Sequence, residues 1–266
     1  MKKSLAWLIP AVLAVAAAGT WYVVQYKTEP GTIAPPPSLA TQEETKPAIN
    51  YPLASEPQEM LPPLEESDAG VQASLQQLFG TADLAAHLIP TQIIRHIVAT
   101  VDNLPRKELA VQLRPLQPVP GNFLVTGSED KQDLMLATEN YARYSPVVRL
   151  LNAIEIQQAA AWYRRFYPLF QQAYENLGYP HGYFNDRLVQ VIDHLLETPE
   201  LRHPSPLVRP NVFYQFADPA LESRSAGQKT LLRMGPDNVL LIKTRLREFR
   251  QAITQSLVTE ASPPVE

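Results

Sequence analysis

The stretch IEIQQAAAWYRRFYPLFQQAYENLG, residues 154–178, decides the fold class of this protein. Its apolar side chains recur at alternating spacings of four and three residues, which places them along one face of an α-helix. They are Ile156, Ala160, Tyr163, Tyr167, Phe170, Tyr174 and Leu177. Gly178 and Pro180 predict the end of this helix, whereas Pro168 removes one backbone hydrogen bond and is expected to kink or divide it.

We call such a row of apolar residues an apolar seam, and further seams predict helices on both sides of this stretch. The seams cover residues 75–101, 184–195 and 239–253. Another helix is expected to open at Ser145, with Pro146 in its first turn. Ser225 and Gln228 resemble a capping box that opens a helix ending before Gly235. Most of the folded part of the chain is therefore predicted to be helical.

One region lacks the helical seam and predicts β-structure instead. Residues 105–137 contain four prolines, and two short apolar runs within them, 123–126 and 134–136, are separated by a Gly-Ser-Glu-Asp turn. This pattern is typical of a small β-hairpin. Residues 211–216, NVFYQF, are expected to add a short extended piece.

Residues 5–24, LAWLIPAVLAVAAAGTWYVV, form an uncharged apolar run long enough to span ~30 Å of hydrocarbon as a helix. Lys2 and Lys3 precede the run and an acidic tract follows it, so the positive-inside rule keeps the amino terminus in the cytoplasm. The rest of the chain is then expected on the other side of the membrane. A cleaved signal peptide is the alternative, because the alanines at 16–18 before Gly19 suit a signal peptidase.

Residues 28–66 contain nine prolines and seven glutamates but a single aromatic residue, Tyr51. Such a segment buries too little apolar surface to fold, and it predicts a disordered, extended tether. The chain is therefore predicted to consist of four parts. They are a single-pass transmembrane anchor (1–27), a Pro/Glu-rich disordered linker (28–66), a mainly α-helical domain with a small β-hairpin (67–258) and a disordered tail (259–266).

Composition excludes several classes of function. The chain has no cysteine, which excludes disulfides, zinc–thiolate sites, iron–sulfur clusters and a cysteine nucleophile. Its net charge of −4 gives no support for nucleic-acid binding, which requires a strongly basic face. No glycine-rich phosphate loop occurs, and the five histidines never stand at the i, i+4 spacing of a helical metal site. We therefore predict neither a cofactor nor a metal.

Three long strings resemble the proteobacterial family known as domain of unknown function 3014. They are NYARYSPVV (140–148), YPLFQQAYENLGYPHGYFNDRLVQVIDHLL (167–196) and RPNVFYQFADPALESRSAGQKTLLRMGPDNVLLIK (209–243). The resemblance extends over roughly residues 67–253. It implies a membrane anchor and an envelope setting, and hence an inner-membrane protein whose main domain is periplasmic. The family has no established activity, so the resemblance implies no catalytic residue.

The loop after the central seam, residues 179–187, combines aromatic side chains with a histidine, an amide, a carboxylate and an arginine. These groups could line a cleft for a sugar or a peptide, with Asp186 as an acid or base. A structural interpretation explains the same residues more simply. In that interpretation Asn185 or a neighbouring residue caps the next helix, Asp186 is favoured at the amino terminus of that helix, and the tyrosines pack on the core.

Arginine outnumbers lysine in the predicted domain by 15 to four, and guanidinium groups suit bidentate contacts with carboxylate or phosphate. These arginines serve either an anionic ligand or internal ion pairs with acidic residues of the domain. Trp162 lies off the apolar seam, so an exposed patch around it would indicate a partner surface. The candidate contacts for a ligand or partner are Trp162, Arg165, His181, Asp186 and Arg187.

The sequence thus predicts an inner-membrane-anchored periplasmic domain that acts as a non-catalytic binding or scaffold module. Its partner is expected to be another envelope protein or an anionic cell-wall ligand. The alternative is a periplasmic hydrolase that cleaves cell-wall glycan or peptide with Asp186 and a second carboxylate. A membrane-proximal spacer is the third possibility.

Overall fold

The computed structural model describes residues 48–53, 60–79, 88–108, 114–118, 121–130 and 132–255. All of them belong to one compact unit, Lys46–Glu266. The predicted membrane span (5–24), most of the predicted linker and the predicted tail (259–266) lie outside the described residues. Among the residues that are described, no helix is both long and apolar enough to cross a bilayer.

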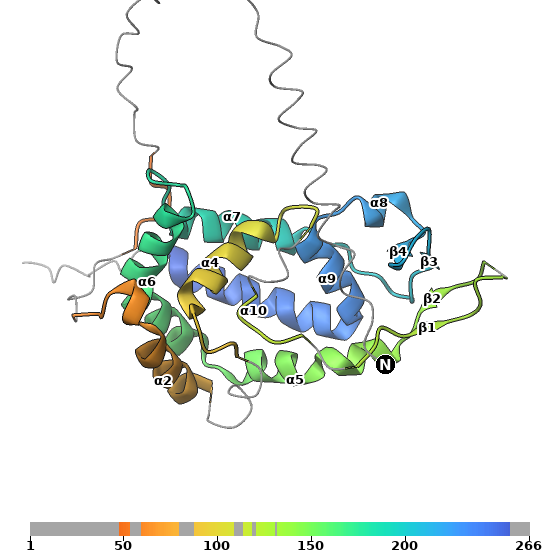
Figure 1. Ribbon diagram of the computed structural model, residues 1–266, viewed down its shortest axis with the longest axis horizontal. Helices are drawn as coiled ribbons and strands as arrows, with labels where there is room; N and C mark the ends of the chain where they lie inside the picture. The colour runs from red at the N-terminus through yellow and green to blue at the C-terminus, as the bar shows by residue number, and fades with distance from the viewer. Residues whose placement is uncertain are drawn as a thin grey trace, which may run out of the picture. The chain divides into compact units, whose positions relative to one another are not determined.

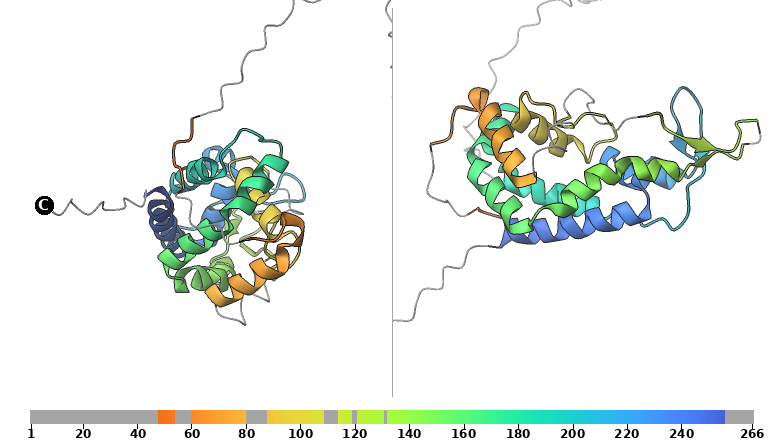
Figure 2. Two further views of the ribbon diagram at one scale, coloured as in Figure 1. Left: turned by 90° about the vertical axis from the view of Figure 1, so that its left-hand side faces the viewer. Right: turned by 90° about the horizontal axis from the view of Figure 1, so that it is seen from below.

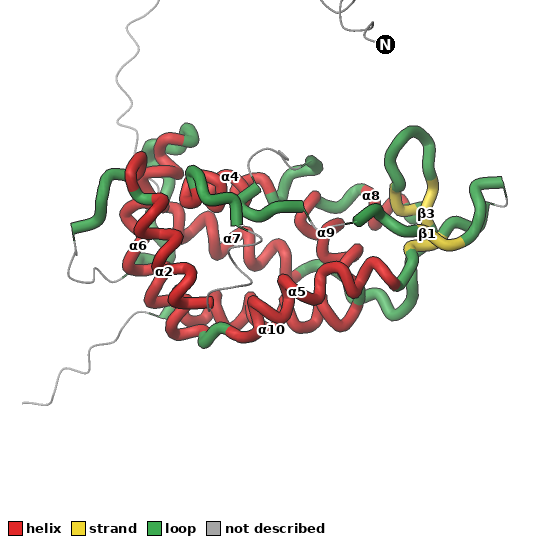
Figure 3. The backbone as a smooth tube through the Cα atoms, turned by 60° about the horizontal axis from the view of Figure 1, so that its bottom comes forward, coloured by secondary structure: helices red, strands yellow, loops and turns green. Residues whose placement is uncertain are grey.

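The unit is mainly helical and carries small β-hairpins, as the sequence predicts. Its helices are η1 (Leu64–Glu66), α2 (Asp68–Phe79), α4 (Ile93–Asn103), α5 (Glu139–Ala153), α6 (Ile156–Asn176), α7 (Phe184–Leu196), α8 (Pro219–Glu222), α9 (Ala226–Met234) and α10 (Pro236–Thr254). Its strands are β1 (Val125–Thr126), β2 (Met135–Leu136), β3 (Leu207–Val208) and β4 (Gln215–Phe216). The strands gather at one end of the unit, away from α2 and α6 (Figures 1 and 3).

The strands form two antiparallel pairs that are joined side by side. Val125 pairs with Leu136 in β1–β2, and Leu207 pairs with Phe216 in β3–β4. The Leu207 N–H donates to the Leu134 carbonyl (2.8 Å), which links the second hairpin to the first. The predicted hairpin at 123–136 is confirmed. The predicted extended piece at 211–216 reduces to the two residues of β4.

Helix α6 supplies much of the core and contacts α2, α4, α7 and α10. Its buried residues are Ala160, Tyr163, Phe166, Leu169, Phe170, Ala173 and Tyr174. Burial of each large side chain contributes roughly 1.5–3 kcal/mol, so this set is a major source of stability. Most of the predicted seam is confirmed, although Leu177 is 40% exposed. Because α6 has neighbours on several sides, Phe166 and Leu169 are buried as well.

The expected division of a helix at Pro168 and the expected helix start at Ser145 are both wrong. Helix α6 runs unbroken through Pro168, whose side chain is exposed, so the loss of one hydrogen bond does not divide the helix. Helix α5 begins at Glu139 and contains Pro146, so Ser145 is not its cap. The buried Asn140 side chain fixes this earlier start, because it donates to the Leu124 carbonyl (2.6 Å) and accepts from the Leu124 N–H (3.0 Å).

Helices α5 and α10 lie side by side and run in the same direction (Figure 2). Asn238 near the start of α10 donates to the Tyr141 carbonyl (3.0 Å), and Arg245 further along α10 donates to the Leu151 carbonyl (3.3 Å). The two contacts follow the same order along both helices. The connection between them therefore has to pass through α6, α7 and the second hairpin.

The turn from α9 to α10 follows the sequence prediction. The Ser225 hydroxyl accepts the Gln228 N–H (3.2 Å) and caps α9, whereas the Gln228 amide donates to the His194 carbonyl (2.9 Å) and not back to the cap. Gly235 ends the helix with φ of 89°. Only glycine adopts this conformation easily, and Pro236 then opens α10.

The structure differs from the predicted linker at its carboxyl-terminal end. Leu64 is buried within η1, and Leu61 packs against the same core. Tyr51 and Leu53 also pack against it. The high proline and glutamate content of residues 28–66 hides these few apolar residues, because composition averages over the whole segment.

Gly235→Ala tests the importance of the α9–α10 turn. The added Cβ would overlap the Tyr141 ring and would require a strained backbone. We expect the free energy of unfolding to fall by about 2 kcal/mol or more, as measured by chemical denaturation followed by circular dichroism.

Gly70→Ala is the matched control, because Gly70 lies within α2 and a Cβ there meets no atom within 4 Å. It is expected to raise the free energy of unfolding by about 0.5–1 kcal/mol. Equal effects of the two substitutions would contradict this account of the turn.

Candidate functional site

The start of α7 holds two of the predicted site residues, Asp186 and Arg187. Phe184, the first residue of the helix, is buried and stacks on Phe170 of α6 with the ring centroids 5.7 Å apart. Because successive residues of a helix point about 100° apart, Asn185, Asp186 and Arg187 leave this anchor in three directions. Each of them meets a different part of the unit.

Asp186 binds the backbone of residues 48–53, which we call the strap. Its carboxylate accepts the N–H of Asn50 (2.8 Å) and the N–H of Tyr51 (2.8 Å) through different oxygens. The Tyr183 hydroxyl accepts the N–H of Leu53 (3.0 Å). The sequence prediction of Asp186 as an acid or base is therefore weakened, because both oxygens already hold the protein's own chain.

Asn185 is fully buried and holds the strap from inside. Its side-chain amide donates to the Tyr51 carbonyl (2.8 Å), while its oxygen accepts from the Tyr163 hydroxyl (3.2 Å). Burial raises the pKa of Tyr163 well above its ordinary value, so the phenol stays a neutral donor. The predicted role of Asn185 as a helix cap is wrong, since the structure places it in the first turn of α7 and not at the cap position.

Arg187 belongs to an ion-pair network around the buried carboxylate of Asp102. Its guanidinium donates to the carboxylate of Asp102 in α4 (3.0 Å), and Arg106 donates to the second oxygen of that carboxylate (2.6 Å). Asp102 is only 1% exposed, and the Tyr179 hydroxyl also donates to it (3.3 Å). The hydrogen bond to Asp102 raises the pKa of Arg106. For Arg187, internal ion pairing is the interpretation that the structure confirms.

The other three predicted residues do not join this site. Trp162 is half-buried against the core, and its indole N–H donates to the Ser74 hydroxyl (2.8 Å), which fixes α2 on α6. Arg165 is exposed, with its guanidinium 5.3 Å from the centroid of the Phe166 ring. His181 is exposed in the turn between α6 and α7. Because Trp162 is half-buried and Phe166 is buried, these residues do not form the exposed patch that would indicate a partner surface.

A groove of about 710 Å³ runs along the outer face of α7, and we call it the α7 groove. The helix contributes polar side chains at helical spacing, and the strap covers one end. The residues that matter here are Tyr51, Asp186, Gln190, Asp193, His194 and Glu197. Asp193 pairs with Arg250 of α10 through two hydrogen bonds (2.5 and 2.9 Å). The apolar seam in the sequence predicted which face of α7 is buried, and the α7 groove lies on the opposite, polar face of the same helix.

The structure reveals a serine–histidine contact that the sequence analysis missed. His194 Nε2 lies 2.8 Å from the Ser225 hydroxyl, as in the nucleophile–base pairs of hydrolases. However, this hydroxyl already accepts the Gln228 N–H. The backbone N–H groups of Ala226 and Gly227, which follow Ser225, donate to the carbonyls of Arg106 (2.7 Å) and Leu104 (2.9 Å). These donors cannot then stabilise an oxyanion. The pair caps α9 and ties it to α7.

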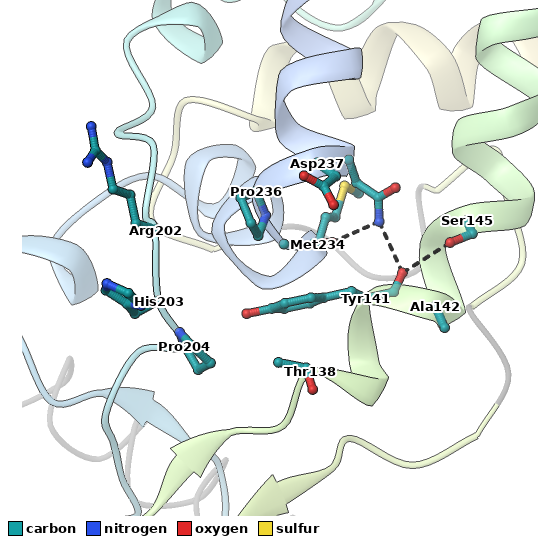
Figure 4. Close-up of a pocket in the computed structure, with 12 residues that line it drawn as sticks. Thr138, Tyr141, Ala142, Ser145, Arg202, His203, Pro204, Met234, Pro236 and Asp237 are labelled. Atoms are coloured by element: carbon teal, nitrogen blue, oxygen red, sulfur yellow. Dashed lines mark hydrogen bonds between the residues drawn. The ribbon is translucent and has the colours of Figure 1, made fainter.

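A second cavity, of about 350 Å³, lies between α5, residues 202–204 and the α9–α10 turn. Figure 4 shows the Tyr141 ring beneath Pro236, with its hydroxyl directed toward His203 and Pro204. Burial raises the pKa of Tyr141, so the phenol is neutral at physiological pH. None of the predicted site residues lines this cavity. Within the described residues, no group of three or more His, Asp or Glu side chains is placed to hold a metal ion.

The hairpins carry an exposed apolar pair. Val212 and Phe213, which we call the hairpin tip, lie between β3 and β4 and are 72% and 79% exposed. Beside them, Arg209 pairs with Glu129 (2.9 Å) and lies over the Tyr214 ring. The sequence analysis identified NVFYQF as extended but gave no reason to expect its apolar residues on the surface.

Comparison with known proteins gives one family. The family model described as "Protein of unknown function (DUF3014)" matches residues 93–250. The chain belongs to this family. No curated protein and no solved structure matches the chain. The DUF3014 match covers α4 through most of α10, so it includes the helical side of the α7 groove, the second cavity and the hairpin tip, whereas the strap precedes the matched residues.

Glu222→Gln tests the support of the second hairpin. Glu222 accepts from Lys229 (2.8 Å) and from the Phe216 N–H of β4 (2.9 Å). Burial alone would raise the pKa of Glu222, but these two hydrogen bonds outweigh it and the net shift is downward. The charged form is therefore favoured in the folded state. Its contribution to stability is present above the ordinary pKa of the group and is lost as the pH falls through the lower folded value.

We expect Glu222→Gln to lower the free energy of unfolding by about 1 kcal/mol at pH 7. The difference from the wild type should shrink as the pH falls below about 4. Denaturation curves across this pH range measure it. Glu129→Gln is the control, because its exposed ion pair with Arg209 contributes little. A deficit of the Glu222 variant that does not change with pH would contradict the assignment.

Proposed function

We propose that this member of the DUF3014 family is a membrane-anchored, non-catalytic module that binds another component of the cell envelope. The observation that supports binding is the hairpin tip. Val212 and Phe213 are adjacent, largely exposed and mounted on a hairpin that bonds to its neighbour. Adjacent exposed apolar side chains are typical of protein contact sites, where one aromatic residue often contributes much of the binding energy.

The same geometry gives less support to the hydrolase alternative. Asp186 is bound to the strap, Arg187 to Asp102, and the Ser225 hydroxyl to its own helix. A hydrolase would need such groups directed toward a substrate. We therefore propose the binding module alone.

Membrane anchoring and a periplasmic location form part of the proposal and rest on the sequence. The apolar run at 5–24, the lysines before it and the acidic tract after it favour an anchor with a cytoplasmic amino terminus. The inner membrane is the expected membrane and the periplasm the expected compartment of the domain.

Reporter fusions after residue 266 test this topology. Alkaline phosphatase, which is active only in the periplasm, should be active in the fusion and should sediment with the membranes. A green fluorescent protein that folds only in the cytoplasm should stay dark at the same position. Deletion of residues 5–24 is the control and should reverse both results. A mature protein that begins at Gly19 and is free of membranes would contradict the anchor.

Site-specific crosslinking tests the hairpin tip. A photo-reactive amino acid at Val212 should give a discrete crosslinked species in cells, and Phe213→Ser should reduce its yield at least several-fold by removing the neighbouring anchor. Since Phe213 is exposed, this substitution should leave the melting temperature unchanged. The same photo-reactive residue at Leu177, in the turn after α6, is the control. Identical products from both positions would argue against a specific contact at the tip.

A further inference from the structure

The strap is recognised through its backbone, and the groups that recognise it are side chains. Asp186 accepts the N–H groups of Asn50 and Tyr51, and Asn185 donates to the Tyr51 carbonyl. Tyr183 accepts the N–H of Leu53. The residue that this pattern omits is Pro52, which has no N–H to donate. The chain bends at Asn50 and Tyr51, which turns both N–H groups toward Asp186. The site therefore suits a peptide that bends in the same way and has a proline at this position.

An aromatic subsite adds selectivity to the backbone contacts. The Arg250 guanidinium lies 5.8 Å from the centroid of the Tyr51 ring, at the distance of a cation–π contact. Its two hydrogen bonds to Asp193 hold the guanidinium in place. The position before the proline is therefore suited to an aromatic side chain.

The α7 groove extends along the helix beyond the residue that holds the strap backbone. Beyond Tyr51 and Asp186 it continues along α7 past Gln190 and His194 to Glu197. The strap lines this open space of about 710 Å³ and leaves it empty. The remaining length of polar helix face offers hydrogen-bonding groups to a segment longer than the strap.

The strap is also held lightly compared with the core. Ile49 is 53% exposed, Asn50 is exposed, and Tyr51 and Leu53 are only half-buried. A segment with few buried apolar contacts opens locally at a small fraction of the global unfolding free energy. The contacts that hold it are thus open to competition.

We propose that the side chains that hold the strap, together with the α7 groove beside it, form a binding site for a bent peptide segment with an aromatic–proline pair, and that the strap occupies this site until a partner peptide displaces it. This site is separate from the hairpin tip, and the inference does not depend on the function proposed there. The apparent affinity for a partner equals the affinity of the open site multiplied by the fraction of time that the strap leaves the site open. Weakening the strap should therefore strengthen peptide binding.

Fluorescence anisotropy on the purified full-length chain in detergent tests this directly. The probe is a fluorescein-labelled peptide with the sequence of residues 46–55, KPAINYPLAS. Tyr51→Pro removes the N–H that donates to Asp186 and the ring that lies on Arg250. We expect this variant to bind the probe at least tenfold more tightly than the wild type does.

Three controls accompany the measurement. Ile49→Pro introduces the same residue at an exposed position and should bind the probe like the wild type. Adding Asp186→Asn to Tyr51→Pro should abolish the gain, because an amide cannot accept both N–H groups. A probe with alanine in place of the tyrosine should bind at least several-fold more weakly. This control changes the probe and leaves the protein unchanged.

Two results would overturn the inference. The first is a Tyr51→Pro chain that binds the probe no more tightly than the wild type, or that keeps the gain when Asp186→Asn is added. The second comes from hydrogen exchange on the wild type with saturating probe. The amides of Asn50 and Tyr51 should lose protection as the probe replaces the strap, and unchanged protection would exclude displacement.

Discussion

The stacking of Phe184 on Phe170 fixes where α7 begins against α6, and the candidate site depends on this placement. Three successive residues leave that anchor in different directions: Asn185 toward Tyr163, Asp186 toward the strap, and Arg187 toward Asp102. A change in the packing of the two rings would turn all three side chains together. The geometry of the α7 groove therefore depends on the packing of the core.

The unit presents its two candidate contact surfaces at different ends. The strap lies beside the start of α7, near α6, whereas the hairpin tip lies among the strands (Figures 1 and 2). The two surfaces also differ in chemistry, because the groove binds backbone through polar side chains and the tip offers apolar ones. A domain built in this way has room for two partners of different kinds at the same time.

Local signals in the sequence predict the helices well, and contacts between distant residues account for the failures. The seams, Gly178, and the Gly235–Pro236 pair act within a few residues, and the structure follows them. The start of α5 instead depends on a side chain bonded to Leu124, 16 residues away. The roles of the predicted site residues depend on still longer separations, such as the 85 residues between Arg187 and Asp102. No periodicity or spacing along the chain encodes such partners.

The parallel pairing of α5 with α10 has a consequence for the order of synthesis. Their contacts join residues 91 to 97 positions apart, and α10, the last described helix, also covers α6 and α7. Until α10 has emerged from the ribosome, the aromatic rings that it covers remain open to water. A nascent chain of this protein thus passes through a stage in which chaperones and proteases can reach those rings, and that stage lasts until α10 is free to pack on α6 and α7.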